Sequence, residues 1–175
     1  MSEHKNQFEN KIILVTGSTQ GVGSETAKLF ALRGAKGIII CGRSEDKGNI
    51  VKDEIEKIGS ECFFVKTNLE NLDDCKNLVA KTDNYFGRID TLVNCAGHTE
   101  RGTILSTTPQ LFDKMFNVNI KAPFFLIQDT IKIMRREKIK VRSRSTSVCR
   151  NSASSSSASN NASFCLSWAS LVKRC

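Results

Sequence analysis

Three glycines in the stretch VTGSTQGVG, residues 15–23, have a spacing that suits phosphate binding. They directly follow an apolar run and open a segment with helical character. The first glycine permits a sharp turn, the second leaves backbone amides open to a diphosphate, and the third lets a helix pack close to a sheet with its positive N-terminus toward phosphate. Because the stretch lies between a strand and a helix, it predicts a dinucleotide site. The loop residues expected to contact a cofactor are Gly17, Ser18, Gln20, Gly21, Val22 and Gly23.

The end of another apolar run carries a second stretch that suits a nucleotide. This is VNCAG, residues 93–97. Ligands of open α/β sheets bind at the carboxyl edge of the strands, where this stretch is expected. Asn94 can tie neighbouring strands together, while Ala96 and Gly97 leave room for a ribose. Taken alone, a tight turn made of small residues explains the stretch equally well.

The choice between NAD and NADP depends on the end of the second apolar run. An acidic residue about 20 positions past the glycines would bind the ribose 2′-hydroxyl of NAD. Arg43 stands there instead and suits the 2′-phosphate of NADP, so we expect NADP, with NAD as the alternative. The competing interpretation is a solvated Arg43 beside a helix-capping Ser44, with Glu45 or Asp46 reaching the ribose. The cofactor-binding candidates outside the glycine loop are Arg43, Asn68, Leu69, Asn94, Ala96 and Gly97.

Strands and helices must alternate to position these residues. Apolar runs rich in Ile, Val and Phe predict buried strands at 11–17, 37–41, 62–66 and 90–94. Segments with helical spacing, each followed by a glycine, lie between them at 22–33, 51–58 and 72–86. Such alternation indicates right-handed βαβ units. The predicted fold is α/β, a Rossmann-type doubly wound parallel sheet with helices on both faces, truncated after the fourth strand and the helix that follows it.

That last helix is predicted from about Gln110 to Arg135, and Pro109 suits its first turn. The 4-3-4-3 spacing of five apolar residues predicts a continuous buried stripe. These residues are Ile120, Phe124, Ile127, Ile131 and Met134. Pro123 lies inside the helix, and because proline has no N–H, the carbonyl of Asn119 loses its helical partner. From the residues alone, Pro123 simply kinks a packed helix.

Over about residues 8–138 the chain resembles the short-chain dehydrogenase/reductase family. Thr16-Gly17-x3-Gly21-x-Gly23 is similar to the family's glycine motif, and Asn94-Cys95-Ala96-Gly97 is similar to its Asn-Asn-Ala-Gly motif, with Cys in second place. FNVNIKAPFF, residues 116–125, resembles the helix that carries the family's catalytic asparagine, which falls on Asn119.

The resemblance implies reversible hydride transfer between NAD(P) and a small alcohol or ketone. It also implies that the freed Asn119 carbonyl holds a water of the proton relay, and that Asn68, where the family usually has Asp, hydrogen-bonds the adenine.

The family's remaining proton-transfer residues are not found in this sequence. The resemblance implies a tyrosine with a lysine four residues later, and a serine after a fifth strand. The single tyrosine, Tyr85, is followed four residues later by Ile89 and precedes the Asn-Cys-Ala-Gly motif. We therefore expect the chain as written to be inactive. Dimerisation through the helix at 110–135, which the resemblance implies, would cover part of its apolar surface.

Residues 1–138 are expected to form the NAD(P)-binding domain, and 139–175 a disordered Ser/Arg-rich tail. From residue 141 onward, 12 of 35 residues are serine, a composition that buries too little apolar surface to offset chain entropy. Residues 1–134 contain 17 basic and 17 acidic residues, whereas the remainder contains nine basic and one acidic. Any attraction to nucleic acid is therefore confined to the tail.

The tail has two interpretations. In the first, which we favour, residues 141–175 are an out-of-frame or mis-spliced reading of a reductase, because every family feature stops where a fifth strand should begin. In the second, they are a basic interaction tail, with Arg142 and Arg144 in a short arginine–serine segment, on a non-catalytic dinucleotide-binding module.

The sequence also indicates in which cellular compartment the protein is expected. The N-terminus is polar and lacks the apolar core of a signal peptide, and no apolar run approaches the roughly 20 residues of a membrane span. The seven cysteines show no metal-like or disulfide-like spacing. We expect a cytoplasmic protein that binds neither a metal nor a membrane.

Overall fold

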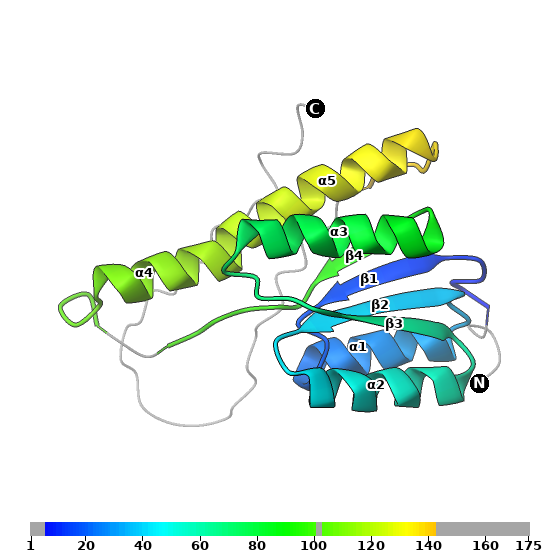
Figure 1. The fold of residues 1–175 in the computed structure, drawn as a ribbon, viewed down its shortest axis with the longest axis horizontal. Coiled ribbons are helices and arrows are strands. Elements are labelled where there is room, and N and C mark those ends of the chain that lie inside the picture. The colour runs from blue at the N-terminus through cyan, green and yellow to red at the C-terminus, as the bar shows by residue number, and fades with distance from the viewer. Residues whose placement is uncertain (1–5, 101–102, 143–175) are drawn as a thin grey trace, which may run out of the picture. The chain divides into compact units, whose positions relative to one another are not determined.

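The computed structural model describes residues 6–100 and 103–142. Strands and helices alternate along most of these residues, as Figure 1 shows. The elements, in chain order, are β1 (Ile12–Thr16), α1 (Gly21–Leu32), β2 (Gly37–Gly42), α2 (Glu45–Ile58), β3 (Glu61–Lys66), α3 (Leu72–Phe86), β4 (Thr91–Asn94), α4 (Pro109–Phe116), the π-helical segment η1 (Asn117–Lys121) and α5 (Ala122–Arg136). The Ser/Arg-rich stretch from residue 143 onward lies outside the described residues.

The four strands form one parallel sheet in the order β3-β2-β1-β4. Leu14 of β1 pairs with Ile39 on one side and with Leu92 of β4 on the other. Since β1 lies between β2 and β4, the chain reverses its direction of travel across the sheet after β3. The predicted Rossmann-type arrangement is confirmed, and the carboxyl ends of all four strands lie at one edge.

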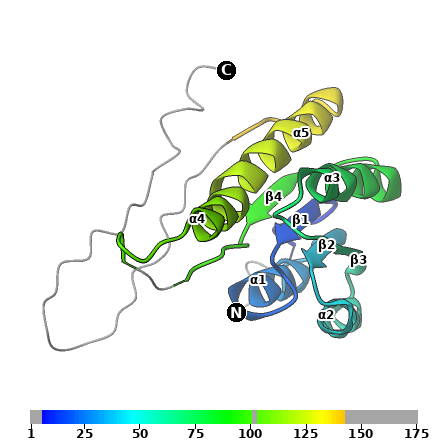
Figure 2. The same cartoon turned by 60° about the vertical axis from the view of Figure 1, so that its left-hand side comes forward.

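Helices cover both faces of the sheet, as Figures 1 and 2 show. On one face, β-strand residues such as Leu14 and Ile39 pack with α3 and α5 through Leu78 and Leu126. On the other face, the alternate strand residues pack with Ala27 of α1 and with α2. Because both faces are buried, β1 and β2 consist almost entirely of apolar residues rather than alternating ones.

Local sequence signals fix where the helices begin and end. Ser44 is the N-cap of α2, and its side chain accepts a hydrogen bond from the backbone N–H of Lys47 at 3.4 Å. Gly59 and Gly87 end α2 and α3 in the left-handed conformation, with φ of 112° and 70°. In the part of the chain that the structure describes, no helix is both long and apolar enough to cross a bilayer.

The predicted helix at 110–135 is present but is not uniform. Its middle, η1, is π-helical, and the backbone N–H of Ala122 bonds to the carbonyl of Asn117 five residues earlier. Pro123 follows at once in the first turn of α5. Because Pro123 has no N–H to give to Asn119, the chain can leave the α-helical pattern here at little further cost.

The predicted buried stripe of this helix is wrong. Phe124 and Ile127 are exposed, and of the five predicted residues only Met134 is buried. The face of α5 that packs toward α3 and the sheet instead consists of Ala122, Leu126, Thr130, Ile133 and Met134. Both sets of residues have helical spacing, so the helix carries two apolar faces and the spacing alone cannot say which of them meets the core.

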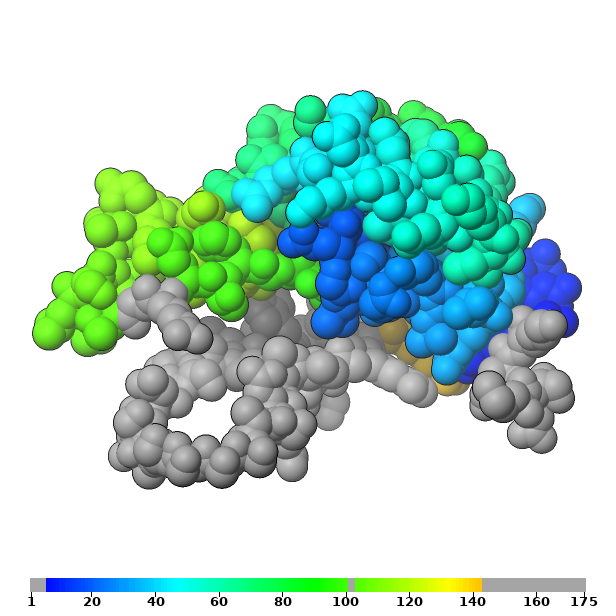
Figure 3. Space-filling model, turned by 90° about the horizontal axis from the view of Figure 1, so that it is seen from below, coloured from blue at the N-terminus to red at the C-terminus, as the bar shows by residue number. Residues whose placement is uncertain are grey.

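The two ends of this helical run differ in their contacts: one is hydrogen-bonded to α3, and the other has no buried residue. At the C-terminal end of α5, the Arg136 guanidinium donates to both carboxylate oxygens of Asp83 on α3, at 2.7 and 2.8 Å. It also donates to the carbonyl of Gly87 at 2.9 Å. At the other end, α4 has no buried residue and extends beyond the sheet, as Figures 1 and 3 show.

Asp90 joins the start of β1 to the segment before β4. Its side chain is only 4% exposed. It accepts hydrogen bonds from the Ile12 amide at 2.9 Å and from Arg88 Nε at 2.9 Å, with Lys11 Nζ 3.4 Å away. Burial alone would raise the pKa of Asp90, but the hydrogen bonds from Arg88 and Ile12 outweigh burial and hold it below its usual value.

We predict that Asp90→Asn lowers the free energy of unfolding at pH 7 by about 1–3 kcal/mol, because a charged hydrogen-bond partner of Arg88 is lost. When the pKa of a carboxylate is lower in the folded than in the unfolded protein, the ionised group stabilises the fold above the unfolded-state pKa of about 3.9. This stabilisation is lost as the pH falls toward the pKa of the folded state. The difference between wild type and variant should therefore be full at pH 6–7 and shrink below about pH 4.

Urea unfolding followed by circular dichroism between pH 3 and 7 measures this difference. Asp129→Asn is the matched control, since among the residues that the structure describes Asp129 pairs only with Lys132 on the same helix, at 2.7 Å. Its effect should stay within about 0.5 kcal/mol. A difference for Asp90→Asn that does not change with pH would contradict the assignment.

Candidate functional site

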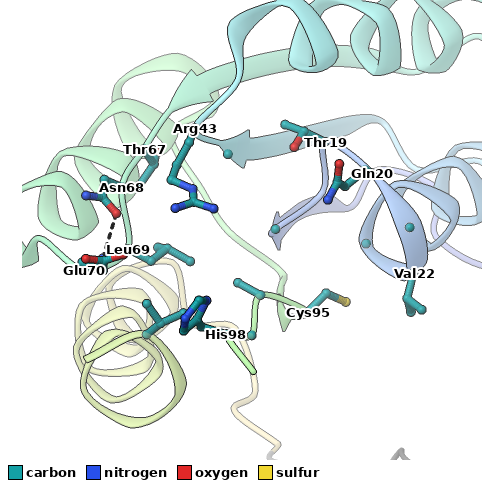
Figure 4. Close-up of a pocket in the computed structure, with 17 residues that line it drawn as sticks. Thr19, Gln20, Val22, Arg43, Thr67, Asn68, Leu69, Glu70, Cys95 and His98 are labelled. Atoms are coloured by element: carbon teal, nitrogen blue, oxygen red, sulfur yellow. Dashed lines mark hydrogen bonds between the residues drawn. The ribbon is translucent and has the colours of Figure 1, made fainter. Parts of the chain in front are cut away.

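A cleft of about 390 Å³ lies at the carboxyl edge of the sheet. Figure 4 shows side chains from the loops after β1, β2, β3 and β4 around it. Ten of the twelve predicted cofactor residues line this cleft: Gly17, Gln20, Gly21, Val22, Gly23, Arg43, Asn68, Leu69, Ala96 and Gly97. Segments far apart in the sequence thus meet at one place, because parallel strands all end at the same edge.

Gly17 and Ala96 set the floor of the cleft. Gly17 has a φ of 62°, and a Cβ added to it would lie 2.7 Å from the Cα of Ala96. The backbone N–H of Ala96 donates to Thr16 Oγ1 at 3.3 Å, which joins the ends of β1 and β4. Glycine is therefore required at position 17 for two reasons: the backbone has a positive φ, and there is no space for a side chain.

The remaining glycines of the loop leave the N-terminus of α1 open. A Cβ on Gly23 would meet the backbone of Gly17, so α1 begins directly against the turn. A Cβ on Gly21 would meet nothing within 4 Å, which leaves space above the loop. The first turn of α1 contains no acidic residue. The positive end of the helix dipole is therefore not neutralised by a side chain and is available to an anion.

Two predicted cofactor residues do not line the cleft. The Ser18 side chain is fully buried, donates to the Val15 carbonyl at 2.6 Å and accepts from the Cys41 amide at 3.0 Å. It thereby connects β1 to β2 beneath the loop. Asn94 is exposed at the end of β4, where it pairs with Thr16 across the sheet. The structure gives both residues a place in the scaffold of the site.

The end of β2 brings positive charge to the cleft. Arg43 is exposed and its side chain points into the cleft in Figure 4. Glu45, the first residue of α2, has its carboxylate 3.7 Å from Lys66 Nζ. Lys47 Nζ donates to Gln20 Oε1 at 2.7 Å, which links α2 to the glycine loop. Of the residues considered for ribose recognition, Arg43 lines the cleft and Glu45 does not.

The loop after β3 is shaped by its own side chains. Asn68 Oδ1 accepts a hydrogen bond from the Glu70 amide at 3.2 Å, and the Asn68 amide donates to Asp74 at 2.8 Å. This Asx-type turn holds Leu69 and Glu70 along the wall of the cleft. A planar base can lie against Leu69 there, and Asn68 lines the same part of the cleft.

Cys95, in the second position of the Asn-Cys-Ala-Gly motif, also lines the cleft. Burial raises the pKa of its thiol, and a hydrogen bond with Thr26 only partly opposes this. The thiol is thus protonated at neutral pH and acts as a small apolar group. In Figure 4 it lies toward Val22, so this end of the cleft is apolar while the Arg43 end is charged.

Asn119 does not line the cleft but holds one residue that does. Its Oδ1 accepts from the backbone N–H of His98 at 2.8 Å, and its Nδ2 donates to the His98 carbonyl at 2.8 Å. One side chain of η1 therefore fixes both backbone groups of His98. The structure brings Asn119 to the end of β4, although 21 residues separate it from His98.

Several residues of the cleft were not predicted: Thr19, Gly42, Thr67, Glu70, Cys95, His98 and Val118. Most of them adjoin a predicted strand end, and this proximity was the available signal. Gly42 has an additional reason to be glycine, since a Cβ there would lie 2.6 Å from Thr19 Cγ2. Val118 could not be found in this way, because it reaches the cleft only through the position of η1.

Comparison with known proteins places the chain in a family. The family model for short chain dehydrogenases matches residues 11–163. An uncharacterized oxidoreductase of Thermotoga maritima is 38% identical over 130 residues, which are 74% of this chain and 51% of that protein. The 7alpha-hydroxysteroid dehydrogenase of Bacteroides fragilis is 34% identical over 132 residues, again 74% of this chain and 51% of its own length. The chain thus spans about half the length of these relatives.

Solved structures agree with this placement. A metagenomic short-chain oxidoreductase in complex with NADP superimposes with a TM-score of 0.72 at 27% identity, covering 75% of this chain and 60% of that one. The F189W actinorhodin polyketide ketoreductase with NADPH gives a TM-score of 0.69 at 25% identity, covering 73% and 49%. With its parallel sheet, glycine loop and family match over most of its length, the chain belongs to the short-chain dehydrogenase/reductase family of oxidoreductases.

Proposed function

We propose that this chain binds NADP(H) in the cleft, as the dinucleotide-binding part of an oxidoreductase that transfers hydride between the cofactor and a small alcohol or ketone. The observation that carries the proposal is the joint presence of the open α1 N-terminus and Arg43 on one cleft. The two solved relatives described above hold NADP and NADPH, which supports a nicotinamide dinucleotide here.

Each part of the dinucleotide has a matching surface. The diphosphate suits the amides at the start of α1 above Gly21, and the 2′-phosphate suits the Arg43 guanidinium. The adenine suits the wall at Asn68 and Leu69, and the adjoining ribose suits the space over Gly97. This arrangement directs the nicotinamide to the apolar end of the cleft, near Val22.

Asn119 is proposed to serve the reaction through its backbone. Pro123 gives no N–H to the Asn119 carbonyl, so the usual i→i+4 helical donor is missing there, and we propose that a water for proton transfer takes its place. The bound cofactor would supply the hydride. The Asn119 side chain meanwhile keeps the loop after β4 in place through its two hydrogen bonds to His98.

A second candidate function is a dinucleotide-binding module without catalysis. It is favoured by Tyr85, the single tyrosine of the sequence. Tyr85 stacks on Phe63 with ring centroids 4.5 Å apart, and it does not line the cleft. A hydrogen bond to Glu61 raises the pKa of Tyr85, whereas a catalytic acid of the family type needs a lowered one. In this non-catalytic module, the exposed faces of α4 and α5 are proposed to pack against a second subunit.

We predict that wild type binds NADPH more tightly than NADH and that Arg43→Asp reverses this order. The variant should weaken NADPH binding about 10- to 100-fold, because charge-assisted hydrogen bonds to the 2′-phosphate are lost and repulsion replaces them. Lys57→Asp makes the same charge change at the opposite end of α2 and should leave both affinities unaltered. Fluorescence titration of each reduced cofactor measures this, and equal wild-type affinities for the two cofactors would refute the assignment of Arg43.

A pair of glycine variants tests the floor of the cleft. Gly17 and Gly87 both have positive φ, 62° and 70°, but only at Gly17 would a Cβ meet neighbouring atoms. Each substitution by alanine should cost about 1–2 kcal/mol for the left-handed backbone. Gly17→Ala should cost more and abolish detectable NADPH binding, while Gly87→Ala should retain it. Thermal unfolding and the same titration measure both effects, and intact binding in Gly17→Ala would show that the cofactor lies elsewhere.

The two candidate functions differ in turnover. We expect residues 1–175 alone to bind NADPH but to reduce simple ketones at least about 10²-fold more slowly than an enzyme with a positioned general acid. NADPH consumption at 340 nm, normalised to the bound fraction, measures this. Ketone-dependent oxidation at rates typical of enzymes would rule out the non-catalytic module. Retention on RNA that disappears when residues 141–175 are removed would favour that module with its basic tail.

A further inference from the structure

His98 lines the cleft, and its imidazole takes no part in the hydrogen bonds that hold the surrounding loops. It follows the Asn-Cys-Ala-Gly motif, and its side chain is 25% exposed. Its Nε2 atom is buried and makes no hydrogen bond with any of the described residues. Both of its backbone groups are already engaged by Asn119. The imidazole is therefore the one part of His98 that is available to a ligand.

The charged groups around this imidazole do not satisfy it. Glu100 Oε2 lies 3.4 Å from Nε2, close enough for attraction to a protonated ring, but the geometry does not form a hydrogen bond. Glu70 and Arg43 line the same cleft. A buried polar atom without a partner is unfavourable, and an apolar side chain at this position would avoid that cost. A ligand in the cleft can supply the missing partner.

The position of the ring indicates which part of the ligand this is. In Figure 4 the imidazole lies on the side of the cleft formed by Leu69 and Glu70, with Arg43 facing it from the loop after β2. Val22 and Cys95 lie toward the opposite end. If Arg43 binds the 2′-phosphate, the group next to His98 belongs to the adenosine half of the dinucleotide and not to the nicotinamide half.

We propose that His98 Nε2 hydrogen-bonds the adenosine half of the bound dinucleotide and sets the affinity for that half. The inference rests on the proposed function. When its ring proton is on Nε2, the imidazole donates to a ribose oxygen or a purine nitrogen. The two Asn119 hydrogen bonds hold the His98 backbone before the ligand arrives, so little conformational freedom remains to be lost on binding.

The test compares His98→Leu with His98→Gln in the full 175-residue chain. Leucine removes the hydrogen-bonding atom at similar volume, whereas glutamine keeps an N–H at similar reach. Isothermal titration calorimetry with NADPH and with adenosine 2′,5′-bisphosphate measures the affinities. We expect His98→Leu to weaken both ligands by the same factor, about 3- to 10-fold. His98→Gln should recover most of this loss. Thermal unfolding of each variant confirms that the fold is retained.

The possible outcomes separate the two proposals. If wild type binds neither ligand, the proposed function fails together with the inference. If wild type binds both and His98→Leu binds them equally well, only the inference fails. If the leucine variant weakens NADPH but not the bisphosphate fragment, His98 contacts the nicotinamide half and the assignment to adenosine is overturned. If glutamine is as weak as leucine, a hydrogen bond from Nε2 is not the cause.

Discussion

The carboxyl ends of β1 and β4 approach so closely that no methyl group fits between Gly17 and Ala96. The rest of the site depends on this contact. It directs the chain away from β1 at a sharp angle, so that α1 begins over the sheet edge with its amides exposed. It also places Ala96 and Gly97 beneath the loop, where any side chain on Gly17 would separate the two halves of the cleft. The hydrogen bond from Ala96 to Thr16 holds the two strand ends at this distance.

Much of this arrangement could be predicted from the sequence, because its causes are local. Strands buried on both faces need continuous apolar runs, and the runs at β1 and β2 were identified within a residue of their bounds. Once the strands are parallel, residues that follow them must meet at one edge, and ten of twelve predicted cofactor residues do so. Spacing does not reveal which way a side chain points. Ser18 consequently turned out to be buried between β1 and β2, with its hydroxyl fully used there.

The features that were missed depend on contacts distant in sequence. The apolar stripe of α5 was assigned to the wrong face, since Leu126 and Ile127 are neighbours in sequence and only packing against α3 decides between them. His98 was missed because a single histidine after a glycine has no pattern. Its significance comes from Asn119, which reaches it from η1. Tertiary structure thus decides what these residue types do, while the sequence limits where they can be.

The π-helical segment η1 has a consequence for the helices on either side of it. Its i→i+5 hydrogen bonding takes up about one residue more than an α-helix needs for the same rotation, and each α-helical residue contributes about 100°. In a regular α-helix of the same sequence, α4 would therefore be turned about its own axis by about 100° relative to α5. The stacked rings of Phe112 and Phe116 would then face another direction, without any change in the residues that form them. The π-helical segment therefore sets the direction in which the exposed aromatic side chains of α4 face relative to the cleft.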